Sequence, residues 1–246
     1  FEDWDESGKA HLIYAPGGQM FWDSGNHGSS TMNVNVTKRS EEKKHEGNSS
    51  AKLNSQFVGV GIAGKFAAGN IFIGEYLDTK GTDGVLGWGR PWSSRPTAVT
   101  AWVHYTPKKI DNVNGKKNTT SGSLTDKSGK VVATINDGDM DAAIIYVAIL
   151  DDHTESYNGK NYPVIIKTAS KDFFDKDSEH VIAYGEVILD KATEGDAMVQ
   201  VRIPLTYKSN KKASNIMLTA AASRYGDYFT GGDGSVLYLD DIQLEY

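Results

Sequence analysis

Carboxylates stand in two short, largely apolar segments at opposite ends of the chain. Glu2 lies in residues 1–4, Phe-Glu-Asp-Trp, and Asp240 and Asp241 lie in residues 236–244. If the two segments form neighbouring strands, the three carboxylates converge on one spot. Clusters of oxygen ligands suit a hard cation, above all Ca²⁺. The pattern therefore predicts adjacent chain ends and a structural Ca²⁺ held by Glu2 and Asp240, with Asp241 as the alternative ligand.

Strand geometry limits how these acids can act together. Side chains alternate between the two faces of a strand, so only one of Asp240 and Asp241 is expected to contact the ion unless the strand bulges. The alternative is that the acids accept hydrogen bonds from nearby backbone amides and hold no metal. Both interpretations give the carboxylates the partners that they need.

Two tryptophans and two arginines gather in the Pro- and Gly-rich segment 87–96. Trp88, Arg90, Trp92 and Arg95 are the candidate substrate-binding residues, because an indole ring can stack on the apolar face of a sugar while guanidinium groups bind its hydroxyls. An exposed tryptophan in a segment of this composition indicates a binding role. The alternative is structural: one tryptophan closes an end of the fold and Arg95 anchors a loop.

Glycoside hydrolysis needs two carboxyl groups about 5–5.5 Å apart for retention, or about 6.5–9.5 Å apart for inversion. The candidates in this chain are Glu75, Asp78, Glu155, Glu186 and Asp227. A pair such as Glu75 and Glu186 sharing a cleft would make the protein an enzyme. The sequence does not select a pair, so no catalytic residue is assigned.

The elements that must position these residues are strands. Apolar residues alternate with polar ones in segments 33–37, 99–105, 199–205 and 216–222, and continuous apolar runs at 142–150 and 181–189 are typical of central strands buried on both faces. Breaks rich in Gly, Asn and Asp separate these runs. One short helix is expected at 170–178, with Phe173 and Phe174 packed inward. The pattern predicts an all-β fold, a β-sandwich of two antiparallel sheets with little helix.

Composition narrows the class of protein. The 246 residues carry a net charge of −6, which disfavours a nucleic-acid partner, and no apolar run has the ~18 residues of a membrane-spanning segment. No cysteine is present, so disulfides and zinc ribbons are excluded. We expect residues 1–246 to form a single domain, the C-terminal part of a longer exported protein. Its oligomeric state is left open.

Short segments along the whole chain resemble one known family, the putative carbohydrate metabolism domain of surface and secreted proteins in Bacteroides-type bacteria. The matching segments are residues 1–4, 21–26, 68–74, 89–96, 105–107, 221–229 and 232–241. The family is similar in fold to calcium-containing jelly-roll modules that bind carbohydrate. The resemblance implies a jelly-roll sandwich that captures or processes glycans outside the cytoplasm, in the periplasm, at the cell surface or in the medium.

Together these observations favour non-catalytic binding of an oligo- or polysaccharide. The first alternative is a glycoside hydrolase or lyase that uses a pair of carboxylates. The second is an adhesion or scaffold domain whose partner is another protein.

Overall fold

The computed structural model describes residues 1–61 and 64–246, and a nine-stranded antiparallel sheet is its largest element. Several of its strands are largely apolar along their length, because both faces of this sheet are covered. Along the sheet the order is β17 (Val164–Lys167), β7 (Asp83–Trp88), β6 (Asn70–Lys80), β21 (Asn215–Ala221), β14 (Ala143–Leu150), β18 (Val181–Leu189) and β20 (Thr206–Tyr207). Two short strands extend it, β1 (Trp22–Asp23) on β6 and β8 (Arg90–Pro91) on β21.

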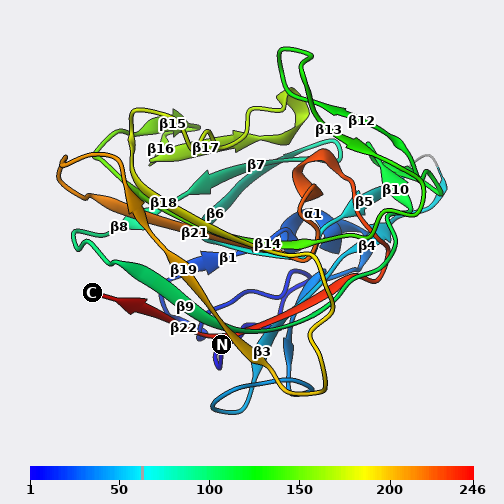
Figure 1. The fold of residues 1–246 in the computed structure, drawn as a ribbon, viewed down its shortest axis with the longest axis horizontal. Coiled ribbons are helices and arrows are strands. Elements are labelled where there is room, and N and C mark those ends of the chain that lie inside the picture. The colour runs from blue at the N-terminus through cyan, green and yellow to red at the C-terminus, as the bar shows by residue number, and fades with distance from the viewer. Residues whose placement is uncertain (62–63) are drawn as a thin grey trace.

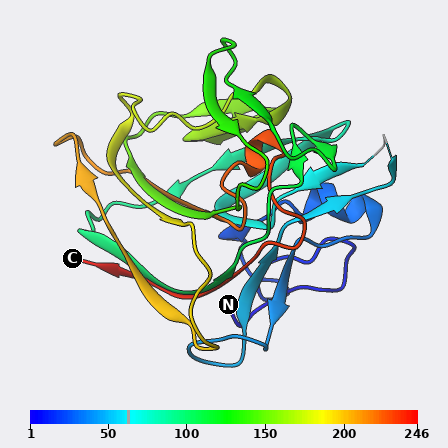
Figure 2. The same ribbon diagram turned by 45° about the vertical axis from the view of Figure 1, so that its right-hand side comes forward.

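A five-stranded antiparallel sheet packs against the large one (Figure 1). Its order is β19 (Val199–Pro204), β9 (Ala98–Thr106), β22 (Val236–Glu245), β3 (Ser50–Asn54) and β2 (Thr37–Ser40). Figure 2 shows the long strands β9 and β22 curving together beneath the large sheet. The predicted β-sandwich of two antiparallel sheets is therefore confirmed.

Strand β14 is buried on both faces, as its continuous apolar run predicts. Ile145, Val147 and Ile149 point into the core between the two sheets. The alternate residues, Tyr146 and Ala148 among them, point to the opposite face and join a second apolar cluster. We call this opposite side of the large sheet its outer face.

Short elements cover the edges and the outer face. They are the hairpins β4 (Gln56–Val58) with β5 (Lys65–Ala67), β10 (Asn112–Val113) with β11 (Lys116–Lys117), β12 (Gly122–Thr125) with β13 (Val131–Ile135), and β15 (Glu155–Tyr157) with β16 (Lys160–Tyr162). The helical pieces are α1 (Asn26–Ser29) and the 3-10 turns η1 (Ser30–Met32), η3 (Thr168–Ser170) and η4 (Gly226–Tyr228). No helix in the described residues has the length and apolarity needed to span a membrane.

The prediction of a helix at 170–178 is wrong. The turn η3 ends at Ser170, and Lys171 takes a left-handed conformation with φ of 54°, so that Asp172 can bridge back to Lys167. A left-handed residue stops a right-handed helix. Phe173 and Phe174 nevertheless pack against the outer-face cluster, as expected.

The N-terminus lies beside the middle of the last strand, β22, but the two segments do not pair as strands. Residues 1–4 form no strand, and β22 instead lies between β3 and β9. The backbone nitrogen of Phe1 lies 3.6 Å from Asp240 Oδ1, and its ring packs edge-on against Trp22. The predicted strand pairing is therefore wrong, because Phe1 is held by ring packing and a polar contact in place of a hydrogen-bond ladder.

Candidate functional site

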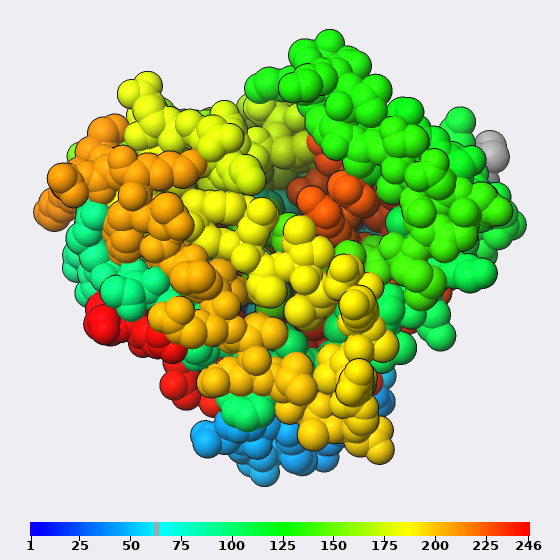
Figure 3. All heavy atoms as spheres, in the orientation of Figure 1, coloured from blue at the N-terminus to red at the C-terminus, as the bar shows by residue number. Residues whose placement is uncertain are grey.

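A cavity of about 220 Å³ opens on the outer face of the large sheet. One residue from each of three neighbouring strands lines it: Tyr146 of β14, Thr219 of β21 and Phe72 of β6. In the sheet, Tyr146 is paired with Thr219, and Thr219 is paired with Phe72. Trp88, at the end of β7, extends this row. The segment that contains η4 borders the cavity, and Figure 3 shows the surface hollowed beside that orange-red segment.

Several aromatic rings line the cavity. They belong to Phe66, Phe72, Tyr76, Trp88, Tyr146 and Phe229. The Trp88 ring lies 5.8 Å from Phe72 and 6.2 Å from Tyr146, inclined by 39° and 57°. Inclined rings at this spacing pack firmly and keep their orientation, so the cavity has rigid apolar sides. A hollow that combines aromatic rings with several polar groups is typical of a ligand-binding site.

Asp227 of η4 is the carboxylate at this cavity. Among the described residues, its carboxyl group accepts no hydrogen bond and forms no ion pair. Burial raises its pKa from 3.8 to about 6. Burial, followed by the charge of Asp227, raises the pKa of Tyr146 well above its ordinary value. The cavity thus combines a partly buried acid with aromatic rings.

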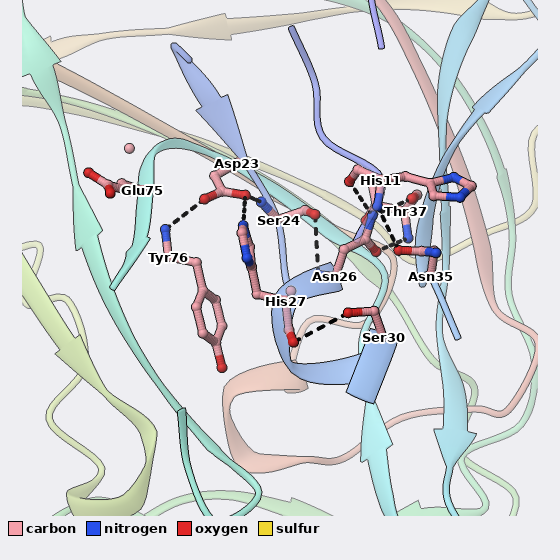
Figure 4. A network of polar contacts seen from close by, with 12 residues as sticks. His11, Asp23, Ser24, Asn26, His27, Ser30, Asn35, Thr37, Glu75 and Tyr76 are labelled. Atoms are coloured by element: carbon pink, nitrogen blue, oxygen red, sulfur yellow. Dashed lines mark hydrogen bonds and ion pairs between the residues drawn. The ribbon is translucent and has the colours of Figure 1, made fainter. Parts of the chain in front are cut away.

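A polar network fixes the cavity wall at Tyr76 (Figure 4). Buried Asp23 accepts hydrogen bonds from the backbone nitrogens of Tyr76, at 2.7 Å, and Ser24, at 2.8 Å. His27 Nε2 lies 3.1 Å from the Asp23 carboxylate, and its ring stacks on Tyr76. Burial opposes the imidazolium, but the hydrogen bond to Asp23 and the charge of Asp23 prevail, so the pKa of His27 is raised. The contact therefore stabilises the fold fully below pH 6.5, and its contribution is lost as the pH rises through that raised pKa.

The predicted substrate-binding residues do not gather in one place. Trp88 is 2% exposed and lies in the floor of the cavity. Trp92 packs against the core between the sheets and borders a different, shallower hollow. The two arginines line neither hollow and bind backbone carbonyls, Arg90 that of Gly74 and Arg95 those of Ser209 and Lys211. The structural alternative thus describes Arg95 well, and sugar binding by these residues stays a prediction.

Four of the five candidate acids lie outside the cavity. Glu75 contacts Lys160 and Tyr162, and the carboxylates of Asp78 and Glu186 accept hydrogen bonds from Tyr157 and Tyr184. Glu155 is exposed at the start of β15. Among the described residues that line the cavity, Asp227 is the one carboxylate.

The acids at the chain ends are partnered by backbone amides. Glu2 accepts hydrogen bonds from the backbone nitrogens of Asn48 and Ser49, and these amides lower its pKa. Asp240 Oδ2 accepts one from the backbone nitrogen of His45 at 2.8 Å. A bulge follows, with a φ of 44° at Asp241, so both Asp side chains lie on the side of His45.

Three groups in this region could hold a metal ion. His45, Glu46 and Asp241 each offer a ligand atom, and these atoms lie within 4.8 Å of one another. His45 Nδ1 lies 3.1 Å from Asp241 Oδ2, and the His45 ring stacks on Trp102 at 3.6 Å. Of the three predicted ligands, Asp241 belongs to this set, whereas Glu2 and Asp240 do not.

Sequence reasoning missed Tyr146, Phe72 and Phe229 as cavity residues. Tyr146 offered one signal, because it is the single aromatic residue in the otherwise aliphatic run 142–150. Phe229 offered none, since its position follows from the turn η4 and a left-handed φ of 51°.

Comparison with known proteins places the chain in a family. Residues 1–245 match the family model described as "Putative carbohydrate metabolism domain". A structure described as a putative glycoside hydrolase from Bacteroides thetaiotaomicron VPI-5482 is 22% identical, with a TM-score of 0.67 over 100% of this chain and 70% of that one. A second, described as a putative glycoside hydrolase from Bacteroides vulgatus ATCC 8482, is 16% identical, with a TM-score of 0.65 over 100% and 96%.

These two structures share the fold of this chain, and a search of curated proteins found no match. The family match extends over nearly the whole chain, in agreement with the segments that pointed to it from the sequence. The chain belongs to the putative carbohydrate metabolism domain family.

Proposed function

We propose that this protein binds carbohydrate in the outer-face cavity, as part of glycan use outside the cytoplasm. One observation carries the proposal: a partly buried carboxylate that forms no ion pair in the described part of the chain, Asp227, lies at a cavity lined by aromatic rings. Sugars present apolar ring faces together with hydroxyl donors, which match these two features. The volume of about 220 Å³ is below the ~300–1,000 Å³ of pockets for drug-sized ligands, so a single sugar unit suits it best.

Binding is favoured over hydrolysis because two carboxyl groups are needed for the usual reaction. Asp227 is the one carboxylate among the described lining residues, and Glu75 and Glu186 are engaged elsewhere by Lys160 and Tyr184. Partial burial raises the pKa of Asp227 to about 6, which suits a general acid and favours the hydrolase alternative. Product analysis of any glycan that binds separates the two functions, since a binding module releases it unchanged.

A glycan array followed by calorimetry tests the proposal. Asp227→Ala is expected to lower the affinity for the best-binding glycan about 10-fold or more, because a hydrogen bond to a charged group contributes about 1.5–3 kcal/mol. Asp233→Ala is the matched control, since Asp233 is an exposed acid close by in the sequence. Unchanged affinity in Asp227→Ala would argue against this cavity. An array without any bound glycan would favour the protein-binding alternative.

We propose further that a divalent cation binds beside Asp241. Ca²⁺ is the ion expected from the sequence, and the carboxylates of Glu46 and Asp241 are suitable oxygen ligands. The imidazole of His45 favours Zn²⁺ or a similar ion over Ca²⁺. Glu2 and Asp240 are better described as acceptors for backbone amides.

Metal titration after chelator treatment tests this second proposal. A bound ion at 100 times its dissociation constant stabilises the fold by about 2.7 kcal/mol, which is visible as a rise in melting temperature. We expect the rise in the wild type and its loss in Asp241→Asn, whereas Asp137→Asn, at an exposed acid, keeps it. A response to Zn²⁺ alone supports the set with His45, a response to Ca²⁺ supports the oxygen ligands, and no response to either contradicts the proposal.

A further inference from the structure

Residues 224–231 form a loop at one side of the cavity, and we call this segment the cavity loop. It contains η4. Its residues that line the cavity are Arg224, Gly226, Asp227 and Phe229. The loop begins after Ser223, beyond the end of β21 in the large sheet, and leads through Gly232 to β22 in the small sheet. The position of these two ends therefore decides where the lining residues of the loop lie.

Both ends of the cavity loop bind to one carboxylate oxygen. Asp141 Oδ2 accepts a hydrogen bond from Ser223 Oγ at 2.6 Å and another from the backbone nitrogen of Gly232 at 2.9 Å. Asp141 Oδ1 accepts one from the backbone nitrogen of Ala142, which precedes β14. Asp141 is 1% exposed, and hydrogen bonds to a charged acceptor are strong in such surroundings. One buried side chain thus connects the start and the end of the loop to the central strand.

A chain of hydroxyl groups extends this contact to both sheets. Burial raises the pKa of Asp141 to about 6, so at pH 7.5 its carboxyl group is ionised and only accepts hydrogen bonds. The Ser223 proton therefore points to Asp141, and the Ser55 hydroxyl, 2.7 Å away, donates to Ser223. Ser55 Oγ in turn accepts a hydrogen bond from the backbone nitrogen of Gly69 at 3.2 Å. Ser55 follows β3 of the small sheet, and Gly69 precedes β6 of the large one.

The hairpin β10–β11 holds the second half of the cavity loop. Gly231 exchanges two backbone hydrogen bonds with Asn112, and the backbone nitrogen of Gly115 donates to the carbonyl group of Phe229 at 2.9 Å. A Cβ atom at Gly231 would come within 2.5 Å of Ser223 Oγ, so glycine permits the two ends of the loop to approach. The hairpin is a surface element, whereas Asp141 connects the loop to the strands.

We propose that Asp141 is a positioning residue of the cavity, whose carboxylate holds both ends of the cavity loop against the two sheets and so fixes Asp227 and Phe229 in place. Asp141 does not line the cavity, so it acts through the loop and not by contact with a ligand. The effect on glycan binding rests on the proposed function, whereas the holding of the loop is a property of the fold alone.

Hydrogen exchange followed by mass spectrometry tests the holding of the loop without a ligand. In the whole chain at pH 7.5, Asp141→Asn is expected to raise the exchange rate of amides in 224–232 about 10-fold, because an amide group has one acceptor oxygen where a carboxylate has two. Peptides from β9 should keep their protection. Ser223→Ala removes one of the two end contacts, so it should give a smaller rise in the same peptides, and it tests the inference if Asp141→Asn does not fold.

Ile203→Val is the control for a general loss of stability. It removes one methyl group from the core between the sheets, on β19, and should leave exchange in 224–232 unchanged.

Calorimetry with the best-binding glycan of the array tests the effect on the cavity. Asp141→Asn and Phe229→Ala should each lower the affinity about 5-fold or more, because a loop that is no longer held must be ordered when the ligand binds. The double variant should lose less than the product of the two single losses, since both act through the same loop. Ile203→Val should bind like the wild type.

The outcomes separate this inference from the proposed function. Unchanged exchange in 224–232, or a rise spread evenly over the chain, overturns the inference whatever is bound. Faster exchange with unchanged glycan affinity in Asp141→Asn also overturns it, as do losses that multiply in the double variant. Faster exchange in the loop of a protein that binds no glycan supports the role of Asp141 in holding the loop and overturns only the proposed function.

Discussion

Trp88→Ala is expected to lower the free energy of unfolding by about 3–5 kcal/mol, the usual range for removal of a buried tryptophan. Trp88 is 2% exposed and packs against Phe72 and Tyr146, so the substitution leaves a void in the outer-face cluster. The lost ring also forms part of the cavity floor, so glycan affinity should fall in the same variant. Urea unfolding followed by circular dichroism measures the stability change.

Trp92→Ala is the comparison for Trp88→Ala. Trp92 belongs to the same segment but is only partly buried against the core between the sheets, so its removal should cost less. If Trp92→Ala is the more destabilising of the two, the assignment of Trp88 to the core of the outer face is mistaken.

Asp227→Asn is expected to stabilise the unliganded protein, by up to about 3 kcal/mol at pH 8 and by very little below pH 4. Burial raises the pKa of Asp227 from 3.8 to about 6, so the folded wild type binds more protons than the unfolded chain between these two values. Its stability therefore falls as the pH rises through this window and stays lowered above it. The amide of asparagine does not ionise, so the variant escapes this loss.

Unfolding of both proteins at several pH values between 4 and 8 checks this prediction. Asp141 contributes a similar slope, because burial raises its pKa to about 6 as well, but it is present in both proteins and cancels in the difference. Asp233→Asn should show no such pH-dependent gain. A stability difference that does not change with pH would mean that the Asp227 carboxyl group is well solvated.

Much of the scaffold followed from the sequence because burial leaves a direct signature there. The run at 142–150 is apolar at nearly every position, and β14 is correspondingly buried by one cluster on each face. The acid pair Asp240 and Asp241 was predicted to separate onto two faces unless the strand bulged, and the bulge is present. These features depend on local patterns, which a single sequence contains.

The candidate site could not be predicted to the same degree, because it depends on long-range packing. The glycines around Trp88 were interpreted as the mark of an exposed segment. In the structure, a side chain at Gly87 would come within 2.4 Å of the Tyr162 ring, and one at Gly89 within 2.8 Å of Pro163. Close packing of a neighbouring segment therefore requires these glycines. Asp227 was one of five candidate acids, and nothing in its neighbours distinguished it.

Alternate residues on two strands of the large sheet face the core and the cavity. Ile145 and Leu218 belong to the interior shared with the small sheet, whereas Tyr146 and Thr219, the next residues along the same strands, border the cavity. Natural variation at the second pair can therefore alter recognition without disturbing the first. Two solved structures with 16–22% identity share this fold. If this cavity binds carbohydrate as proposed, exchanges at Tyr146 and Thr219 should change the sugar that is bound and leave the interior intact.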